Sequence, residues 1–182
     1  MKRALLFALA LCACNEEVAQ NTDPLPLAPE TLGYFCQMNL LEHEGPKGQV
    51  HLDGLPGAPL FFSQVSDLVT YLRLPEQSNT VLAIYVSDMG ADGATWEEPG
   101  AANWTDATSA TYVVGADVTG GMGAPELAPF ADPAKAEAFA ALHGGSVMGL
   151  EAIPDSALTP LTPDLTGDDD YSDRLKSLST GG

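Results

Sequence analysis

The chain has 182 residues, 45% of them hydrophobic, which is enough for one modest globular domain or two small packed halves. It carries 7 basic and 25 acidic residues, for a formal net charge of −18. This charge repels nucleic-acid phosphates and offers no basic patch to lipid headgroups. It therefore argues against nucleic acid as a partner and leaves a covalent lipid as the route to a membrane.

The N-terminus has the features of a bacterial lipoprotein signal peptide. Two basic residues precede an apolar run, residues 4–11, which is far shorter than the roughly 20 residues that a membrane span needs. Small residues then precede Cys14, as at the sites where such signals are cleaved and the new N-terminal cysteine is acylated. We therefore predict a signal peptide over residues 1–13 and lipidation of Cys14, with palmitate among the acyl chains. Cys12 fits less well, because Leu11 would directly precede the cut.

The cysteine count changes once the signal is removed. Cys12 leaves with the signal peptide and Cys14 is consumed by the lipid, so Cys36 is the only free thiol of the mature chain. Exported compartments favour disulfides, yet no intramolecular disulfide can form here. An unpaired thiol in such a compartment indicates that Cys36 has a use.

Composition divides the mature chain into five segments. Residues 14–31 are polar and punctuated by proline, and are predicted to be a lipidated tether. Residues 32–87 and 110–153 are predicted to be two α/β halves, joined by an irregular connector over residues 88–109. Residues 154–182 are expected to form an acidic, disordered tail. Its run of three aspartates lacks the glycine and the terminal glutamate of a calcium-binding EF-hand loop.

The first half begins with the sulfur-bearing stretch Tyr34-Phe35-Cys36-Gln37-Met38. If this backbone is extended, the side chains of Cys36 and Met38 point to the same face, because successive side chains alternate. A thiolate and a thioether are soft donors that suit Cu(I) far better than calcium, magnesium or manganese. The alternative is that both sulfurs are ordinary core side chains, since free cysteine is often buried and methionine fills gaps.

Alternation and helical spacing predict the remaining elements of the first half as strand, short strand, helix and closing strand, over residues 49–53, 60–62, 63–72 and 80–86. Ser63 is the expected N-cap of the helix, whose apolar residues follow a helical period from Val65 onward. His51 alternates with Val50, so its side chain is expected to face away from the core.

The second half repeats this order, with strands over residues 110–114, 127–130 and 146–153. Asp132 is a suitable N-cap for the intervening helix, with Pro133 at its first position and a Gly-Gly pair at its end. The chain is therefore predicted to adopt an α/β (α+β) fold made of two tandem, similar strand–strand–helix–strand halves.

Three motifs together resemble the NosL family, the copper-binding accessory lipoproteins of nitrous oxide reductase. They are Cys36-Gln37-Met38, then His43-Glu44-Gly45-Pro46-Lys47-Gly48-Gln49, and Gly120-Gly121-Met122-Gly123-Ala124-Pro125-Glu126. The resemblance implies a non-enzymatic Cu(I) chaperone in the periplasm, lipid-anchored to the outer membrane of a Gram-negative bacterium. Its implied partners are the nitrous oxide reductase apo-enzyme and the membrane transporter complex that assembles it. The family fold is described as two similar small α/β halves.

The same resemblance implies copper ligands. Cys36 and Met38 correspond to the family's first motif, and Met122 to a methionine thought to complete the site. Met122 is flanked by glycines rather than by the apolar neighbours of a core methionine, which favours a ligand role. His43 is a further candidate, although a solvated loop histidine fits its position equally well. If both regions bind one ion, we expect the two halves to place equivalent loops side by side.

Two other classes of protein compete with a chaperone. A blue-copper electron-transfer protein needs two histidines with its cysteine and a weak axial methionine, on a β-sandwich rather than on alternating strands and helices. A thiol redox enzyme needs a resolving partner or a general base near Cys36, and neither can be assigned. A lipoprotein interaction module without metal is the remaining alternative, which failure to bind Cu(I) would favour.

Overall fold

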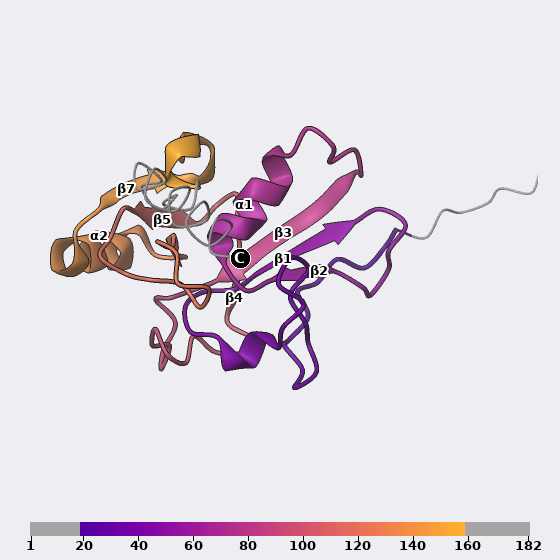
Figure 1. Cartoon of the computed structure of the whole chain (residues 1–182), viewed down its shortest axis with the longest axis horizontal. Helices are drawn as coiled ribbons and strands as arrows, with labels where there is room; N and C mark the ends of the chain where they lie inside the picture. Colours follow the sequence, from indigo (N-terminus) through magenta and orange to yellow (C-terminus); the bar gives the residue numbers. More distant parts are fainter. Residues whose placement is uncertain (1–18, 159–182) are drawn as a thin grey trace, which may run out of the picture.

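The computed structural model describes residues 19–158, which Figure 1 shows coloured along the chain. The predicted signal peptide, the lipidation site Cys14 and the acidic run near residue 169 lie outside the described residues. Within the described range, no helix is both long enough and apolar enough to cross a membrane.

The first unit contains β1 (Gly48–Leu52), β2 (Leu60–Phe62), α1 (Val65–Arg73) and β3 (Val81–Ser87). Strand β1 lies between β2 and β3 and is antiparallel to both. The connector adds β4 (Trp104–Asp106) to the free edge of β3, so the sheet order is β2-β1-β3-β4. Figure 1 shows α1 crossing one face of this sheet.

The second unit contains β5 (Thr111–Val114), β6 (Ala128–Phe130), α2 (Pro133–His143) and β7 (Ser146–Gly149). Its sheet order is β6-β5-β7, again antiparallel, with the first strand in the middle and the strand after the helix at one edge. Both units therefore share one topology, which confirms the predicted α+β class and the two similar halves. The closing strand is shorter than predicted, because 3-10 helices η2 (Leu150–Ala152) and η3 (Asp155–Ala157) follow β7.

The two helices begin in different ways. The carboxylate of Asp132 accepts a hydrogen bond from the N–H of Ala134 at 2.9 Å, and Pro133 occupies the first turn of α2, as predicted. For α1, the prediction that Ser63 is the N-cap is wrong. Gln64 is the N-cap residue, and its side chain makes no capping hydrogen bond. Instead, the first backbone N–H groups of α1 donate hydrogen bonds to the carboxylate of Glu126, a residue of the second unit.

Hydrophobic side chains of both units form a shared core, and a smaller cluster packs between the second sheet and α2. Phe62 and Leu68 contribute from the first unit, Tyr112 and Leu127 from the second, and all four are at most 2% exposed. The hydroxyl of Tyr112 donates to the carbonyl of Ala107 at 2.7 Å, so its polar atom is satisfied inside the core. The two halves are therefore parts of a single folded body.

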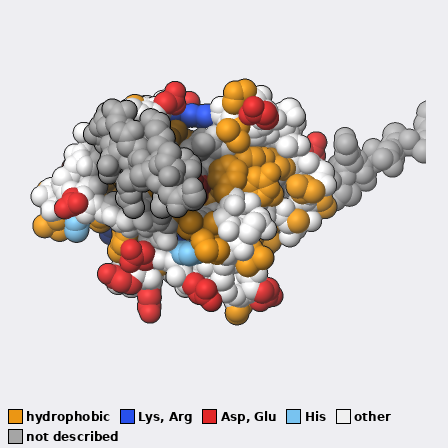
Figure 2. All heavy atoms as spheres, in the orientation of Figure 1, with side chains coloured by type: hydrophobic (Ala, Val, Ile, Leu, Met, Phe, Trp, Pro, Cys, Tyr) orange, Lys and Arg blue, Asp and Glu red, His pale blue; other side chains and the backbone are white. Residues whose placement is uncertain are grey.

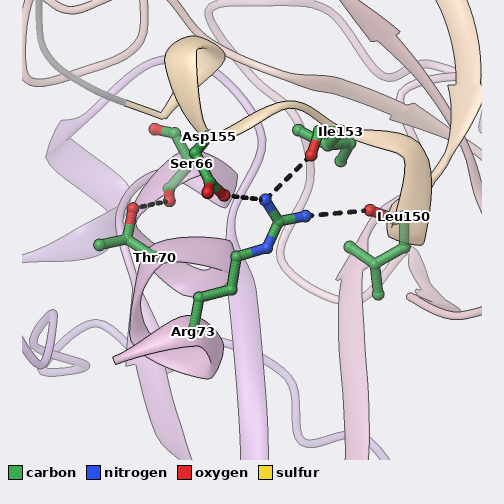
Figure 3. A network of polar contacts seen from close by, with 6 residues as sticks. All are labelled: Ser66, Thr70, Arg73, Leu150, Ile153 and Asp155. Carbon is green, nitrogen blue, oxygen red and sulfur yellow. Dashed lines mark hydrogen bonds and ion pairs between the residues drawn. The ribbon is translucent and has the colours of Figure 1, made fainter. Parts of the chain in front are cut away.

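The C-terminal end of α1 is also held by the second unit (Figure 3). The guanidinium of Arg73 donates to the carbonyl of Ile153 at 2.9 Å and to that of Leu150 at 3.4 Å, and pairs with Asp155 at 2.6 Å. Because the Asp155 side chain is 89% exposed, this ion pair contributes little to stability. The bonds to backbone carbonyls fix the segment after β7 against α1.

Part of the predicted tether packs against the first sheet. The backbone of Leu25 exchanges two hydrogen bonds, each of 3.0 Å, with the side-chain amide of Gln49, and Leu27 is 7% exposed. This segment covers the side of β1 that carries His51, which is consequently buried rather than solvated. Its Nε2 atom lies 3.0 Å from Oε1 of Gln49. Alternation alone did not reveal this cover.

Candidate metal centre

Cys36 and Met38 lie in a tight loop closed by a β-bridge between Leu32 and Asn39. The N–H of Gly33 donates to the carbonyl of Met38 at 3.0 Å, and Gln37 adopts a left-handed conformation with φ of 56°. The predicted extended backbone is therefore wrong here. The chain reverses direction within the motif, so simple alternation does not place the two sulfurs.

The side chain of Gln37 holds this loop in shape. Its amide donates to the carbonyl of Tyr34 at 2.7 Å and to that of Gly33 at 3.2 Å, while its backbone N–H donates to Gly33 at 2.9 Å. The thiol of Cys36 packs directly on Gly33, because a Cβ atom added there would lie 2.4 Å from Sγ. Only glycine leaves the thiol this position.

Aromatic side chains anchor the same loop to the first unit. Tyr34 and Phe35 contact Phe62 of β2 and Tyr71 of α1, with ring centroids 5.5 to 6.3 Å apart in edge-on arrangements. Such pairs add about 0.5–1.5 kcal/mol each beyond the area they bury. Cys36 is therefore carried by a loop whose neighbours are fixed on both a strand and a helix.

Met122 lies at the tip of a second tight turn, between β5 and β6. Gly120 and Ala124 close the turn with a 2.8 Å hydrogen bond, and the N–H of Gly123 returns to the carbonyl of Gly120 at 2.8 Å. Gly123 has φ of 77°, which glycine adopts without strain. The Met122 side chain is 43% exposed, so the turn presents its thioether at the surface.

Cys36 and Met122 line the same cleft, which has a volume of about 330 Å³. Gln64, Ser66 and Asp67, at the N-terminus of α1, lie along the same cleft. The cleft thus combines a thiol of the first unit with a thioether of the second, 86 residues apart in sequence, across the beginning of α1.

The loops that meet here are not equivalent in the two units. Met122 lies between the first two strands of its unit, whereas Cys36 precedes the first strand of its own. The counterpart of the Met122 turn is the β1–β2 loop over residues 53–59. The expectation that equivalent loops lie side by side is therefore wrong, although the two motifs do meet.

Met38 and His43 lie beside this cleft rather than in its lining. Met38 is 40% exposed, and its carbonyl lies 4.0 Å from Sγ of Cys36. His43 packs on the Met122 turn, because a Cβ atom on Gly121 would lie 2.5 Å from Cβ of His43. The Nε2 atom of His43 is buried without a hydrogen-bond partner, and His43 lines a neighbouring depression with Glu97.

Residues 19–158 contain no group of three or more His, Cys, Asp or Glu side chains that could hold a metal ion. The residues that line the cleft include two with soft sulfur atoms, Cys36 and Met122.

Two buried charged side chains near the cleft, Lys47 and Glu126, had no role predicted from the sequence. Lys47 is 1% exposed and donates to the carbonyls of Glu44 and Gly45. Burial lowers the pKa of Lys47 to about 8, while the charges of Glu126, Glu44 and Cys36 act to raise it. Lys47 thus holds the His43 loop in place and puts a cation in the electrostatic neighbourhood of the thiol.

Glu126 is the second buried charge. Its carboxylate accepts hydrogen bonds from the backbone N–H groups of Val65 at 3.1 Å, Ser66 at 3.0 Å and Leu127 at 2.7 Å. Burial raises the pKa of Glu126 to about 7, against the opposing effect of these hydrogen bonds. The motif containing Glu126 was recognisable in the sequence, but a glutamate before an apolar strand reads as solvent-exposed.

Hydrophobic side chains surround the Cys36 loop at the surface. Leu32, Tyr34, Phe35 and Leu41 are each between 43% and 52% exposed. Figure 2 shows hydrophobic side chains gathered near the middle of the visible face, with acidic side chains around its edge. A charge-poor surface beside the thiol suits a site that meets another macromolecule.

A model of the NosL family matches residues 24–158 of this sequence. This chain belongs to the NosL family. It is 52% identical over 185 aligned residues to the copper-binding lipoprotein NosL of Achromobacter cycloclastes, covering 97% of this chain and 94% of that relative. It is 36% identical over 155 residues to the copper-binding lipoprotein NosL of Stutzerimonas stutzeri, covering 85% and 78% of the two chains.

A solved NosL structure has the same fold. The crystal structure of the copper chaperone NosL from Shewanella denitrificans matches with a TM-score of 0.68 at 27% identity, covering 75% of this chain and 98% of that one. The resemblance seen in the three sequence motifs is confirmed. The family match, over residues 24–158, includes the N-terminal segment that packs on β1 and ends where the described residues end.

Proposed function

We propose that this protein is a periplasmic, lipid-anchored Cu(I) chaperone that delivers copper for the assembly of the copper centres of nitrous oxide reductase. One observation carries the proposal: a thiol and a thioether from opposite halves of a NosL-family chain, Cys36 and Met122, line one cleft. The relatives in Achromobacter and Stutzerimonas are copper-binding lipoproteins, and the structural match from Shewanella is a copper chaperone.

Cys36 is the proposed principal ligand, since its thiolate is the only anionic sulfur that the mature chain would carry. Met122 supplies a thioether from the opposite side of the cleft, and Met38 supplies another from the Cys36 loop. His43 packs on the Met122 turn, and its buried, unpartnered Nε2 makes it a candidate for a further ligand. A donor set of mainly soft sulfur selects Cu(I) over Zn(II).

The geometry also suits release of the cargo. Met38 and Met122 are about two-fifths exposed, so an incoming donor can approach the metal without unfolding of the chain. A neutral thioether is a weaker donor than the thiolate and would leave first, with Cys36 leaving last. The glycines on either side of Met122 let its turn move during this exchange. Few ligands and a partly open cleft favour transfer over permanent storage.

The anchor and the partners follow from the family and from the leader. Acylation of Cys14 would hold the domain at the periplasmic face of the outer membrane. The acceptors we propose are the apo-form of nitrous oxide reductase and the membrane transporter complex that assembles it. A pull-down from denitrifying cells with the copper-loaded lipoprotein would identify which of them takes the copper directly.

A Cu(I) competition titration tests the proposed chemistry. The mature lipoprotein in detergent should hold Cu(I) tightly, and Cys36→Ser should abolish tight binding, because the anionic ligand is lost. Leu41→Ala is a matched control, since Leu41 is exposed beside the same loop and carries no donor atom. Absence of Cu(I) binding by the wild-type protein, or unchanged affinity in Cys36→Ser, would contradict the proposal.

A further inference from the structure

Glu126 connects the second unit to the helix of the first. Both oxygens of its carboxylate are used: Oε2 accepts from the N–H of Val65, and Oε1 accepts from the N–H groups of Ser66 and Leu127. Val65 and Ser66 are the first two residues of α1, whose own N-cap residue, Gln64, makes no side-chain capping bond. The helix therefore depends on a carboxylate 60 residues away for its N-terminal cap.

The Met122 turn is packed against this carboxylate. A Cβ atom on Gly120 would lie 3.0 Å from Oε2 of Glu126 and 2.6 Å from Nε2 of Gln64. Both ends of the turn are thereby constrained, since Thr119 and Pro125 form a β-bridge and Glu126 follows Pro125 directly. Trp96 supports the same base, because its indole N–H donates to the carbonyl of Thr119 at 2.8 Å.

The loop that carries the other sulfur, that of Cys36, also contacts α1. The Cys36 loop is anchored through Tyr34 and Phe35 to Tyr71, which belongs to α1. Gln64 and Ser66 at the start of α1 line the same cleft as Cys36 and Met122. Both loops are therefore positioned by contacts with α1. Glu126 makes the contact between the second unit and the N-terminus of this helix.

We propose that Glu126 is a positioning residue of the copper site, which sets the Met122 turn across the cleft from Cys36 by fixing it to the N-terminus of α1. The inference rests on the proposed function. Glu126 does not touch the metal: it acts on Met122. Loss of its paired acceptors should let the turn shift while both sulfurs remain present. Cu(I) should then be held as if Met122 were missing.

A double-mutant cycle with Met122 tests this role. Glu126→Gln keeps the size of the side chain but replaces one acceptor oxygen with an NH2 group, which faces a backbone N–H donor. In the wild-type mature lipoprotein we expect it to lower Cu(I) affinity about tenfold, within the coupling expected for residues of one network. In a Met122→Ala background the same change should lower affinity less than twofold. X-ray absorption at the copper edge should count one sulfur fewer in Glu126→Gln.

Asp132→Ala is the matched control for helix destabilisation, because alanine removes the N-cap acceptor. Asp132 caps α2 through the N–H of Ala134, as Glu126 caps α1, but it does not line the cleft. It should lower thermal stability without changing Cu(I) affinity. Gly120→Ala provides a second route, because its Cβ atom would lie 2.6 Å from Nε2 of Gln64 and 3.0 Å from Oε2 of Glu126, which crowds the base of the turn while the bonds to α1 remain. It should reproduce the affinity loss even if Glu126→Gln folds poorly.

The outcomes separate this inference from the proposed function. Failure of the wild-type protein to bind Cu(I) would overturn both. Tight wild-type binding with unchanged affinity and sulfur count in Glu126→Gln and Gly120→Ala would overturn the positioning role alone. The same holds if the loss in Glu126→Gln is equally large with and without Met122, or if Asp132→Ala shows the same loss, since either result indicates general destabilisation.

Discussion

Burial of Glu126 links the stability of the domain to pH. Its pKa is raised to about 7 in the folded chain, from an ordinary value of 4.5. The protonated carboxyl is therefore favoured by folding, so its contribution to stability is fully present below about pH 4.5 and is lost as the pH rises through 7. A difference of roughly 2.5 between the two pKa values corresponds to about 3 kcal/mol.

This effect can be isolated by comparison with Glu126→Gln, whose side chain does not titrate. Urea unfolding of the copper-free proteins at several pH values between 4.5 and 8 gives the two stability profiles. The free energy of unfolding of the wild type, relative to the variant, should fall by about 3 kcal/mol over that range. With an m-value of about 2 kcal/mol per M urea, the relative midpoint moves by about 1.5 M.

Neighbouring charges must be kept out of the comparison. Asp67 also has a pKa raised by burial, and its charge is one of the causes that raise the pKa of Glu126. Burial lowers the pKa of Lys47 to about 8, so Lys47 begins to lose its charge only at the upper end of the range tested. Adding Asp67→Asn to both proteins should leave most of the difference in place. Parallel wild-type and Glu126→Gln profiles would refute the argument, because Glu126 would then have no raised pKa.

Three further predictions follow from the leader, the donor set and the Cys36 loop. Mass spectrometry of the mature N-terminus should find an acylated Cys14, and Cys14→Ala should leave the signal peptide attached; an acylated Cys12 would contradict this. Excess Zn(II) should not displace Cu(I) under reducing conditions, and displacement by equimolar zinc would mean that nitrogen or oxygen ligands dominate. Gly33→Ala should weaken Cu(I) binding, because its Cβ atom would lie 2.4 Å from Sγ of Cys36. Gly149→Ala, with open space at its Cβ position, is the control that should bind normally.

Features governed by local chemistry could be predicted from the sequence. The helix α2 begins where Asp132 and Pro133 indicate and ends at Gly144, whose φ is 73°. The order of strands and helices followed from apolar periodicity, and so did the repeat of that order. The three motifs, read together, were sufficient for the family. Each of these signals lies within a few residues of the structure that it determines.

Features set by contacts between distant segments could not be predicted. The N-terminus of α1 is capped by Glu126, and no sequence pattern around Gln64 predicts this contact. His51 is buried because residues near Leu25 cover its side of the sheet. Composition had predicted that these residues belong to a tether. The turn at Cys36 depends on the amide of Gln37, whose bonds to Gly33 and Tyr34 override the extended conformation that alternation suggested.

The departure from symmetry explains why the site lies where it does. In the first unit, the β1–β2 loop lies beside the N-terminal segment, and both line a depression that includes Asp53 and Thr22. Its counterpart in the second unit contacts His43 and Trp96 instead, and it folds into the turn that carries Met122. The α1 helix is bound to the second unit at both ends. Arg73 ties its C-terminus to the segment after β7, and Glu126 accepts hydrogen bonds from its N-terminus. Two copies of one topology thus contribute different loops to a single cleft, which a strictly symmetric pair could not do.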